Sequence, residues 1–150
     1  MNDKRQMIPA VGLLATVVAA VYIVVQLSAQ TPSPTGDFTS AALAEVRDAQ
    51  GQVILSGKFE LVEEDDDDVE RKAALAPTGV DADATGEAEI EFSRAAPAEQ
   101  EIEFSVRNVP AGAVLTFVID GTVVATATAD ARGRAEVELD VRMPGTAAAR

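Results

Sequence analysis

The stretch from Glu89 to Ser105 contains the sequence EIEFS twice, and each copy alternates an acidic with an apolar residue. A period of two places the apolar side chains on one face of a β-strand and the acidic side chains on the other. After Phe38, short runs of Val, Ile, Thr and Phe are bounded by Gly, Pro and Asp. This pattern predicts an all-β fold, a small antiparallel meander sandwich or open barrel of about eight strands.

The turn residues divide this part of the chain into eight expected strands. They are residues 43–49, 52–62, 70–76, 87–93, 101–109, 113–119, 122–129 and 134–141. Gly57 predicts a bulge or bend inside its strand, and the strand 113–119 is apolar on both faces, which favours a central place in the sheet. The side chains expected in the core alternate along three strands: Ala88, Ile90, Phe92, Ile102, Phe104, Val106, Ala135, Val137, Leu139 and Val141.

Two kinds of turn are predicted from short motifs. Asp120-Gly121 lies between two strands, and Asp-Gly favours the type I′ hairpin turn, in which both residues have positive φ. The pattern D-A-x-G occurs three times, beginning at Asp48, Asp83 and Asp130. Its Asp carboxylate is expected to accept backbone N–H groups, and its Gly is expected to take the left-handed conformation that returns the chain to a strand.

The register of the repeated strands follows from their shared core face. A seven-residue loop places Glu91 opposite Glu103, and a five-residue loop places Glu91 opposite Glu101 and Glu89 opposite Glu103. Both registers put Glu opposite Glu, so these four side chains should form one exposed acidic face at a cost of tenths of a kcal/mol per pair. Solvent and salt, a divalent cation or a nearby arginine could offset the repulsion. The candidate arginines are Arg94, Arg107 and Arg134.

The composition excludes several classes of function. Lys and Arg number 12 against 25 Asp and Glu, so the formal net charge is −13, which argues against a nucleic-acid partner. Cys and His are both absent, which removes Ser–His and Cys–His nucleophile pairs and His- or Cys-based zinc sites. Only oxygen ligands remain, and they suit calcium or magnesium. No catalytic signature is present, so we expect a protein that is not an enzyme.

The start of the chain predicts a membrane anchor. No charged residue occurs between Gln6 and Gly36, and the mostly apolar residues 7–27 are long enough for a helix that spans a bilayer. Lys4 and Arg5 precede this span, so the positive-inside rule places residues 1–6 in the cytoplasm. Residues 28–37 predict a Pro-rich linker and residues 38–150 an exported β-domain. These features predict a single-pass membrane protein, and the Ala-rich composition without Cys or N-glycosylation motifs favours a bacterial cytoplasmic membrane.

A cleaved signal peptide is the alternative to a retained anchor. Both interpretations export the domain. The apolar run is longer than a usual signal-peptide core. The nearest cleavage motif, Leu27-Ser28-Ala29, has Leu where a small residue is preferred. Length and motif therefore favour the retained helix.

Two acidic segments outside the repeat raise the question of cation binding. Residues 63–68 are six consecutive acids, interpreted as a disordered, solvated loop or, alternatively, as a low-affinity cation loop. Residues 81–86 match the first half of an EF-hand loop, which predicts calcium ligands at Asp81, Asp83, Thr85 and Glu87. The second half of that motif fails, because Phe92 stands where a bidentate Glu is required.

The function expected from these features is that of a membrane-anchored, exported β-domain. It would act as a non-catalytic structural or interaction module at the cell envelope, with a protein partner of unknown identity. The alternatives are an acidic calcium-binding module and a secreted β-domain released by signal-peptide cleavage. No cofactor other than calcium is expected.

Overall fold

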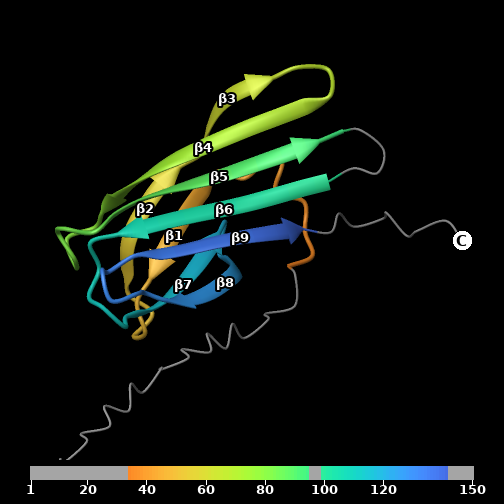
Figure 1. Ribbon diagram of the computed structural model, residues 1–150. Coiled ribbons are helices and arrows are strands. Elements are labelled where there is room, and N and C mark those ends of the chain that lie inside the picture. The colour runs from red at the N-terminus through yellow and green to blue at the C-terminus, as the bar shows by residue number, and fades with distance from the viewer. Residues whose placement is uncertain (1–33, 95–98, 142–150) are drawn as a thin grey trace, which may run out of the picture.

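The computed structural model describes residues 34–94 and 99–141, and this part of the chain is all β (Figure 1). The strands form a nearly closed antiparallel barrel, which confirms the all-β class and the open barrel of the two predicted architectures. Their bounds are β1 Leu43–Arg47, β2 Val53–Lys58, β3 Glu60–Glu64, β4 Asp68–Pro77, β5 Thr85–Ser93, β6 Glu99–Arg107, β7 Val114–Ile119, β8 Thr122–Thr128 and β9 Ala135–Val141.

The strand order differs from the predicted meander. It is β8-β7-β1-β2-β4-β5-β6-β9, with β3 paired to β4 beside this path. Two pairings are not between consecutive strands: β1 pairs with β7, and β6 pairs with β9. Strands β8 and β9 are the two ends of the hydrogen-bonded order, so the barrel remains open between them. Hydrophobic alternation does not specify such long-range pairings, because it fixes the face of a strand and not its neighbour.

The predicted strand 52–62 is two strands in the structure. β2 pairs with β1 and, through Leu55 and Ser56, with β4; β3 pairs with β4, and the buried Phe59 lies between the two strands. Gly57 is not a bulge, because its pairing with Ala44 continues the regular register. A Cβ at Gly57 would overlap the carbonyl oxygen of Ala74, so the glycine allows β4 to approach β2 closely.

The core has the composition that the alternation predicted. Ala88, Ile90, Ile102, Phe104 and Val106 are buried on β5 and β6. On β9, the end residues Ala135 and Val141 are buried, and Val137 and Leu139 pack partly buried against the same cluster. Phe92, near the end of β5, is half-buried. Strand β7 has a neighbour on each side, as predicted, and its Phe117 ring lies 5.0 Å from that of Phe104.

The predicted turns are confirmed in three of four cases. Asp120 and Gly121 have φ values of 46° and 81°, as the type I′ turn requires. The carboxylates of Asp48 and Asp130 each accept two backbone N–H groups, and the glycines three residues later have positive φ. The prediction is wrong at Asp83. Gly86 lies inside β5, and Gly79 supplies the positive φ of the β4–β5 connection instead.

A short segment before β1 is joined to distant strands. The N–H of Phe38 donates to Oε1 of Gln100 at the start of β6 (3.3 Å), and the Asp120 carboxylate accepts from the N–H of Ala42. Between residues 34 and 94 and between residues 99 and 141, no helix is long and apolar enough to span a membrane. The predicted anchor at residues 7–27 lies outside these described ranges.

Candidate functional site

Carboxylates occupy two adjacent rows across the outer side of β3, β4, β5, β6 and β9. The row nearer the β3–β4 turn is Glu63, Glu70, Glu91, Glu101 and Asp140. The next row is Glu60, Lys72, Glu89, Glu103 and Glu138. We call these ten residues the acidic face. Nine of the ten are acidic, and they lie on the front sheet of Figure 1.

The register of the repeated strands is one of the two expected from sequence. Glu89 lies opposite Glu103 and Glu91 lies opposite Glu101, which is the five-residue-loop register. These four residues therefore share one outer face, as predicted; Glu91 and Glu103 are exposed, and Glu89 and Glu101 are half-buried. The extension of the face to β3, β4 and β9 was not predicted, because it depends on the non-consecutive pairing of β6 with β9 and on the length of β4.

Lys72 is the one cation in the two rows. Its Nζ lies 2.6 Å from a carboxylate oxygen of Glu70 on the same strand and 3.3 Å from one of Glu89 on β5. The contact with Lys72 lowers the pKa of Glu70, and the two carboxylates raise the pKa of Lys72. The sequence offered Arg94, Arg107 and Arg134 for this role, and within the described residues none of the three forms an ion pair with the face.

Two carboxylates of the face bind protons more tightly than an isolated glutamate. Partial burial is the main cause of the raised pKa of Glu89, and it outweighs the opposing effect of Lys72. Partial burial also raises the pKa of Glu101, and repulsion from Glu138, Glu91 and Asp140 adds to it. Repulsion among Glu101 and its acidic neighbours is therefore a secondary cost of the face, which a bound cation would offset.

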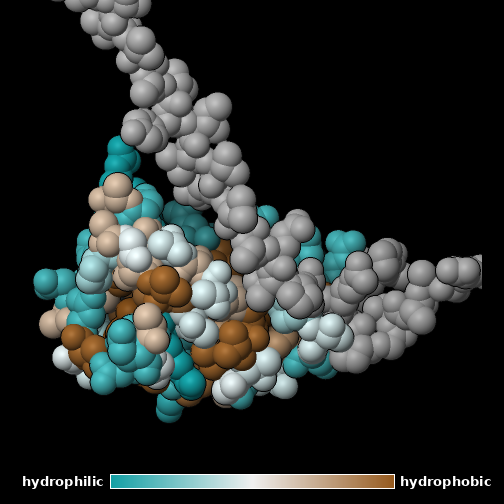
Figure 2. Space-filling model, turned by 90° about the horizontal axis from the view of Figure 1, so that it is seen from below, coloured by the Kyte–Doolittle hydropathy of each residue, from teal (hydrophilic) through white to brown (hydrophobic). Residues whose placement is uncertain are grey.

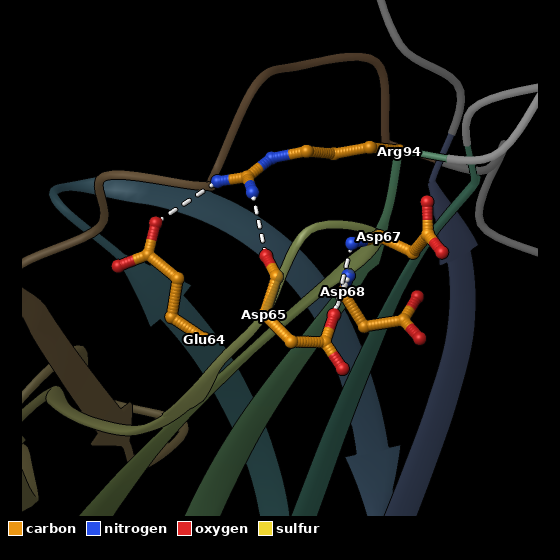
Figure 3. Close-up of polar contacts among 5 residues, drawn as sticks. All are labelled: Glu64, Asp65, Asp67, Asp68 and Arg94. Atoms are coloured by element: carbon orange, nitrogen blue, oxygen red, sulfur yellow. Dashed lines mark hydrogen bonds and ion pairs between the residues drawn. The ribbon is translucent and has the colours of Figure 1, made fainter.

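The six-acid segment 63–68 comprises the end of β3, the hairpin turn at residues 65–67 and the first residue of β4, and the interpretation as a disordered loop is wrong (Figure 3). The carboxylate of Asp65 accepts the N–H groups of Asp67 (2.9 Å) and Asp68 (2.8 Å), which lowers the pKa of Asp65. Arg94, at the end of β5, donates to a Glu64 carboxylate oxygen (3.0 Å) and to the Asp65 carbonyl (3.0 Å). One carboxylate and one arginine thus order an acidic turn.

An acidic groove of about 390 Å³ lies where this turn meets the ends of β5, β6 and β9. Eight carboxylates line it: Glu63, Asp65, Asp68, Glu70, Glu91, Glu99, Glu101 and Asp140. Among the described residues no basic side chain lines it. Gln100 also contributes to its wall. That residue is only 2% exposed, and its Nε2 has no hydrogen-bond partner in the described part of the chain.

The residues predicted to bind calcium lie at the other end of the sheet. Asp81 and Asp83 belong to the β4–β5 connection, and Thr85 and Glu87 lie on the outer side of β5. In the described residues, no group of three or more acidic side chains converges as a metal site. Calcium binding at these positions stays a prediction.

The other outer surface of the barrel has a different character. Glu45 and Arg47 on β1 form an ion pair of 2.6 Å, and the neighbouring strands β7 and β8 expose Val114 and Val123. Figure 2, which shows the molecule from below, displays hydrophobic side chains among polar ones. The negative charge of the domain is therefore concentrated on one side.

Comparison with known proteins returned no relative: no family model matches the chain, and no curated protein or solved structure matches it significantly. A function for this domain therefore has to be argued from the geometry of the acidic face and the groove.

Proposed function

We propose that this chain is a membrane-anchored interaction module of the bacterial cell envelope, and that its acidic face binds a cationic partner without catalysis. The N-terminus would lie in the cytoplasm, residues 7–27 would cross the membrane, and the barrel would lie outside. The uncharged run after Lys4 and Arg5 supports this topology. The single observation that supports the binding role is the pair of acidic rows, with Lys72 as their one cation.

The spacing of the carboxylates favours an extended cationic partner over a single metal ion. Neighbouring strands lie about 4.8 Å apart, and alternate residues along one strand lie about 6.7 Å apart. Ligands of one calcium ion must all lie within about 2.6 Å of it. The same two-residue repeat would match an extended peptide whose lysines or arginines alternate along its length.

The calcium-binding module remains the alternative function. The half EF-hand motif at Asp81, Asp83, Thr85 and Glu87 supports it. Calcium binding there would depend on the β4–β5 connection, and peptide binding would depend on the acidic face. Substitutions at the two ends of the sheet therefore separate the two functions.

Titration of the full chain, in neutral detergent, with a fluorescent peptide of alternating Lys and Thr tests the proposal. Glu91→Lys with Glu103→Lys reverses two charges of the face, and Asp81→Lys with Asp83→Lys makes the same net change elsewhere. We expect the first double variant to bind about tenfold more weakly, since each exposed ion pair contributes about 0.2–1 kcal/mol. The second should bind like the wild type.

Two outcomes would argue against the acidic face as the peptide-binding site. Equal loss of peptide binding in both double variants would show that net charge alone attracts the peptide. A rise in thermal stability with calcium, beyond that of sodium chloride at equal ionic strength and abolished by Asp81→Lys with Asp83→Lys, would favour the calcium-binding module.

A further inference from the structure

A second cavity, of about 280 Å³, lies on the side of the sheet opposite the acidic face. Its apolar wall consists of Leu61 on β3, Val69 on β4 and Phe92 on β5. Arg71 of β4 lies on the same side, because it is paired directly with Leu61 and with the buried Ile90. A guanidinium group therefore borders a cavity that has one apolar wall, in a strongly acidic protein.

The charge of Arg71 has no acidic partner in the described part of the chain. No carboxylate there lies within ion-pair distance of it. Its Nη1 donates to the carbonyl oxygen of Ala41 (3.1 Å), and its Nε is buried without a hydrogen-bond partner. An arginine enclosed in this way is normally paired with an acid. This chain has about twice as many acids as bases, so the missing partner is unexpected.

The other charged groups that line the cavity, Arg94, Glu64 and Asp37, each have a hydrogen-bond partner in the described part of the chain. Glu64 accepts from Arg94 at 3.0 Å, and the second terminal nitrogen of Arg94 donates to the Asp65 carbonyl. The carboxylate of Asp37 accepts from the N–H of Thr39 (3.0 Å) and from its hydroxyl (2.6 Å). Among the described residues that line the cavity, Arg71 is thus the cationic side chain without a carboxylate partner.

We propose that this cavity binds a small amphipathic carboxylate, with the carboxylate group on Arg71 and a short apolar group against Leu61, Val69 and Phe92. Arginine presents N–H donors in a planar fork that suits carboxylates. The volume is just below the usual range for small-molecule sites, which limits the ligand to a small organic acid or the last residue of a peptide. Arg71 points to the inner side of the sheet and the acidic face lies on its outer side, while Val69 and Phe92 border both this cavity and the acidic groove.

Two substitutions test the site in different ways. Arg71→Met removes the charge and also the bond to Ala41. Leu61→Glu leaves Arg71 in place and puts a carboxylate on the residue directly opposite it. Leu61 is 51% exposed, so this change need not disturb the core. Arg132→Met, in the β8–β9 turn, is the matched control for the loss of one arginine.

The measurement is a titration of the full chain, followed by amide chemical shifts, with hexanoate, hexanol, N-acetyl-leucine and N-acetyl-leucine amide. We expect hexanoate and N-acetyl-leucine to shift the amide signals of the cavity, and the two uncharged compounds to have no effect. Both Arg71→Met and Leu61→Glu should weaken binding at least tenfold, and Arg132→Met should bind like the wild type. A preference between the two acids identifies a free organic acid or a peptide end as the source of the ligand.

The proposal is overturned if neither acid binds the wild type, or if Leu61→Glu binds as well as the wild type. In either case Arg71 serves only to hold the segment at Ala41. The double variant Glu91→Lys with Glu103→Lys should bind hexanoate at least as well as the wild type. The peptide-binding proposal for the acidic face and the carboxylate-binding proposal for this cavity are therefore tested with different variants and different ligands, so either can be refuted without the other.

Discussion

Asp120 and Leu43 are joined by two reciprocal hydrogen bonds across 77 positions of the chain. The N–H of Leu43 donates to the Asp120 carboxylate (2.9 Å), and the N–H of Asp120 donates to the Leu43 carbonyl (3.0 Å). The same carboxylate accepts from the N–H of Ala42. A hairpin-turn residue thus also fixes the start of β1, which explains Asp at this position better than turn propensity alone.

The two roles of Asp120 can be separated by substitution. Asp120→Gly keeps the positive φ and removes the carboxylate, so it should lower the free energy of unfolding by about 1 kcal/mol. Asp120→Ala should cost about 1 kcal/mol more, because Ala is strained at a φ of 46°. Asp120→Asn should lie nearest the wild type. Urea denaturation measures all three, and a Gly variant as stable as the wild type would contradict the role of the carboxylate.

Glu101 should make stability depend on pH. Its folded-state pKa is raised above 4.5 by burial and by three neighbouring acids. The folded state therefore holds this proton more tightly than the unfolded state, and its contribution to stability falls as pH rises from 4.5 through the raised pKa. Glu101→Gln should be more stable than the wild type at pH 7 and no more stable at pH 3. Glu136→Gln, outside the two rows, is the control. An equal gain in stability at pH 7 from Glu136→Gln would contradict the assignment of this pH dependence to Glu101.

The acidic face should also make stability depend on salt. Glu91 lies between Glu70 and Glu101, so salt that screens this repulsion should raise the urea midpoint of the wild type. Glu91→Lys should raise the midpoint at 10 mM NaCl and reduce its dependence on salt. Asp83→Lys makes the same charge change away from the face. If Glu91→Lys and Asp83→Lys reduce the salt dependence of the urea midpoint equally, that dependence comes from net charge and not from the acidic face.

The retained anchor predicts the accessibility of the chain in cells. Protease added to intact spheroplasts should digest residues after 38 and leave residues 1–27 protected. Mass spectrometry of the untreated protein should find the N-terminus at or next to Met1. A mature chain beginning near Gln30 would favour the cleaved signal peptide.

The sequence by itself determined which side chains of most strands point to the core, where several turns lie, and which four glutamates of β5 and β6 belong to the acidic face. Ile90 and Phe104 are in the core because a period of two leaves only one face for them, and Glu89 and Glu103 are then forced to the other face. The Asp-Gly turn at Asp120 follows equally locally, since few residues tolerate positive φ. These features depend only on residues close together in the chain.

The tertiary structure decided which strands are neighbours, and with that the extent of the site. Lys72 reaches Glu89 only because β4 pairs with β5, and Asp140 extends the row of Glu101 only because β6 pairs with β9. The neighbours of Arg71, which are Leu61 on β3, Ile90 on β5 and the carbonyl of Ala41, likewise come from distant parts of the chain. Such contacts join residues far apart in sequence, and alternating hydrophobicity carries no information about which strand lies beside which.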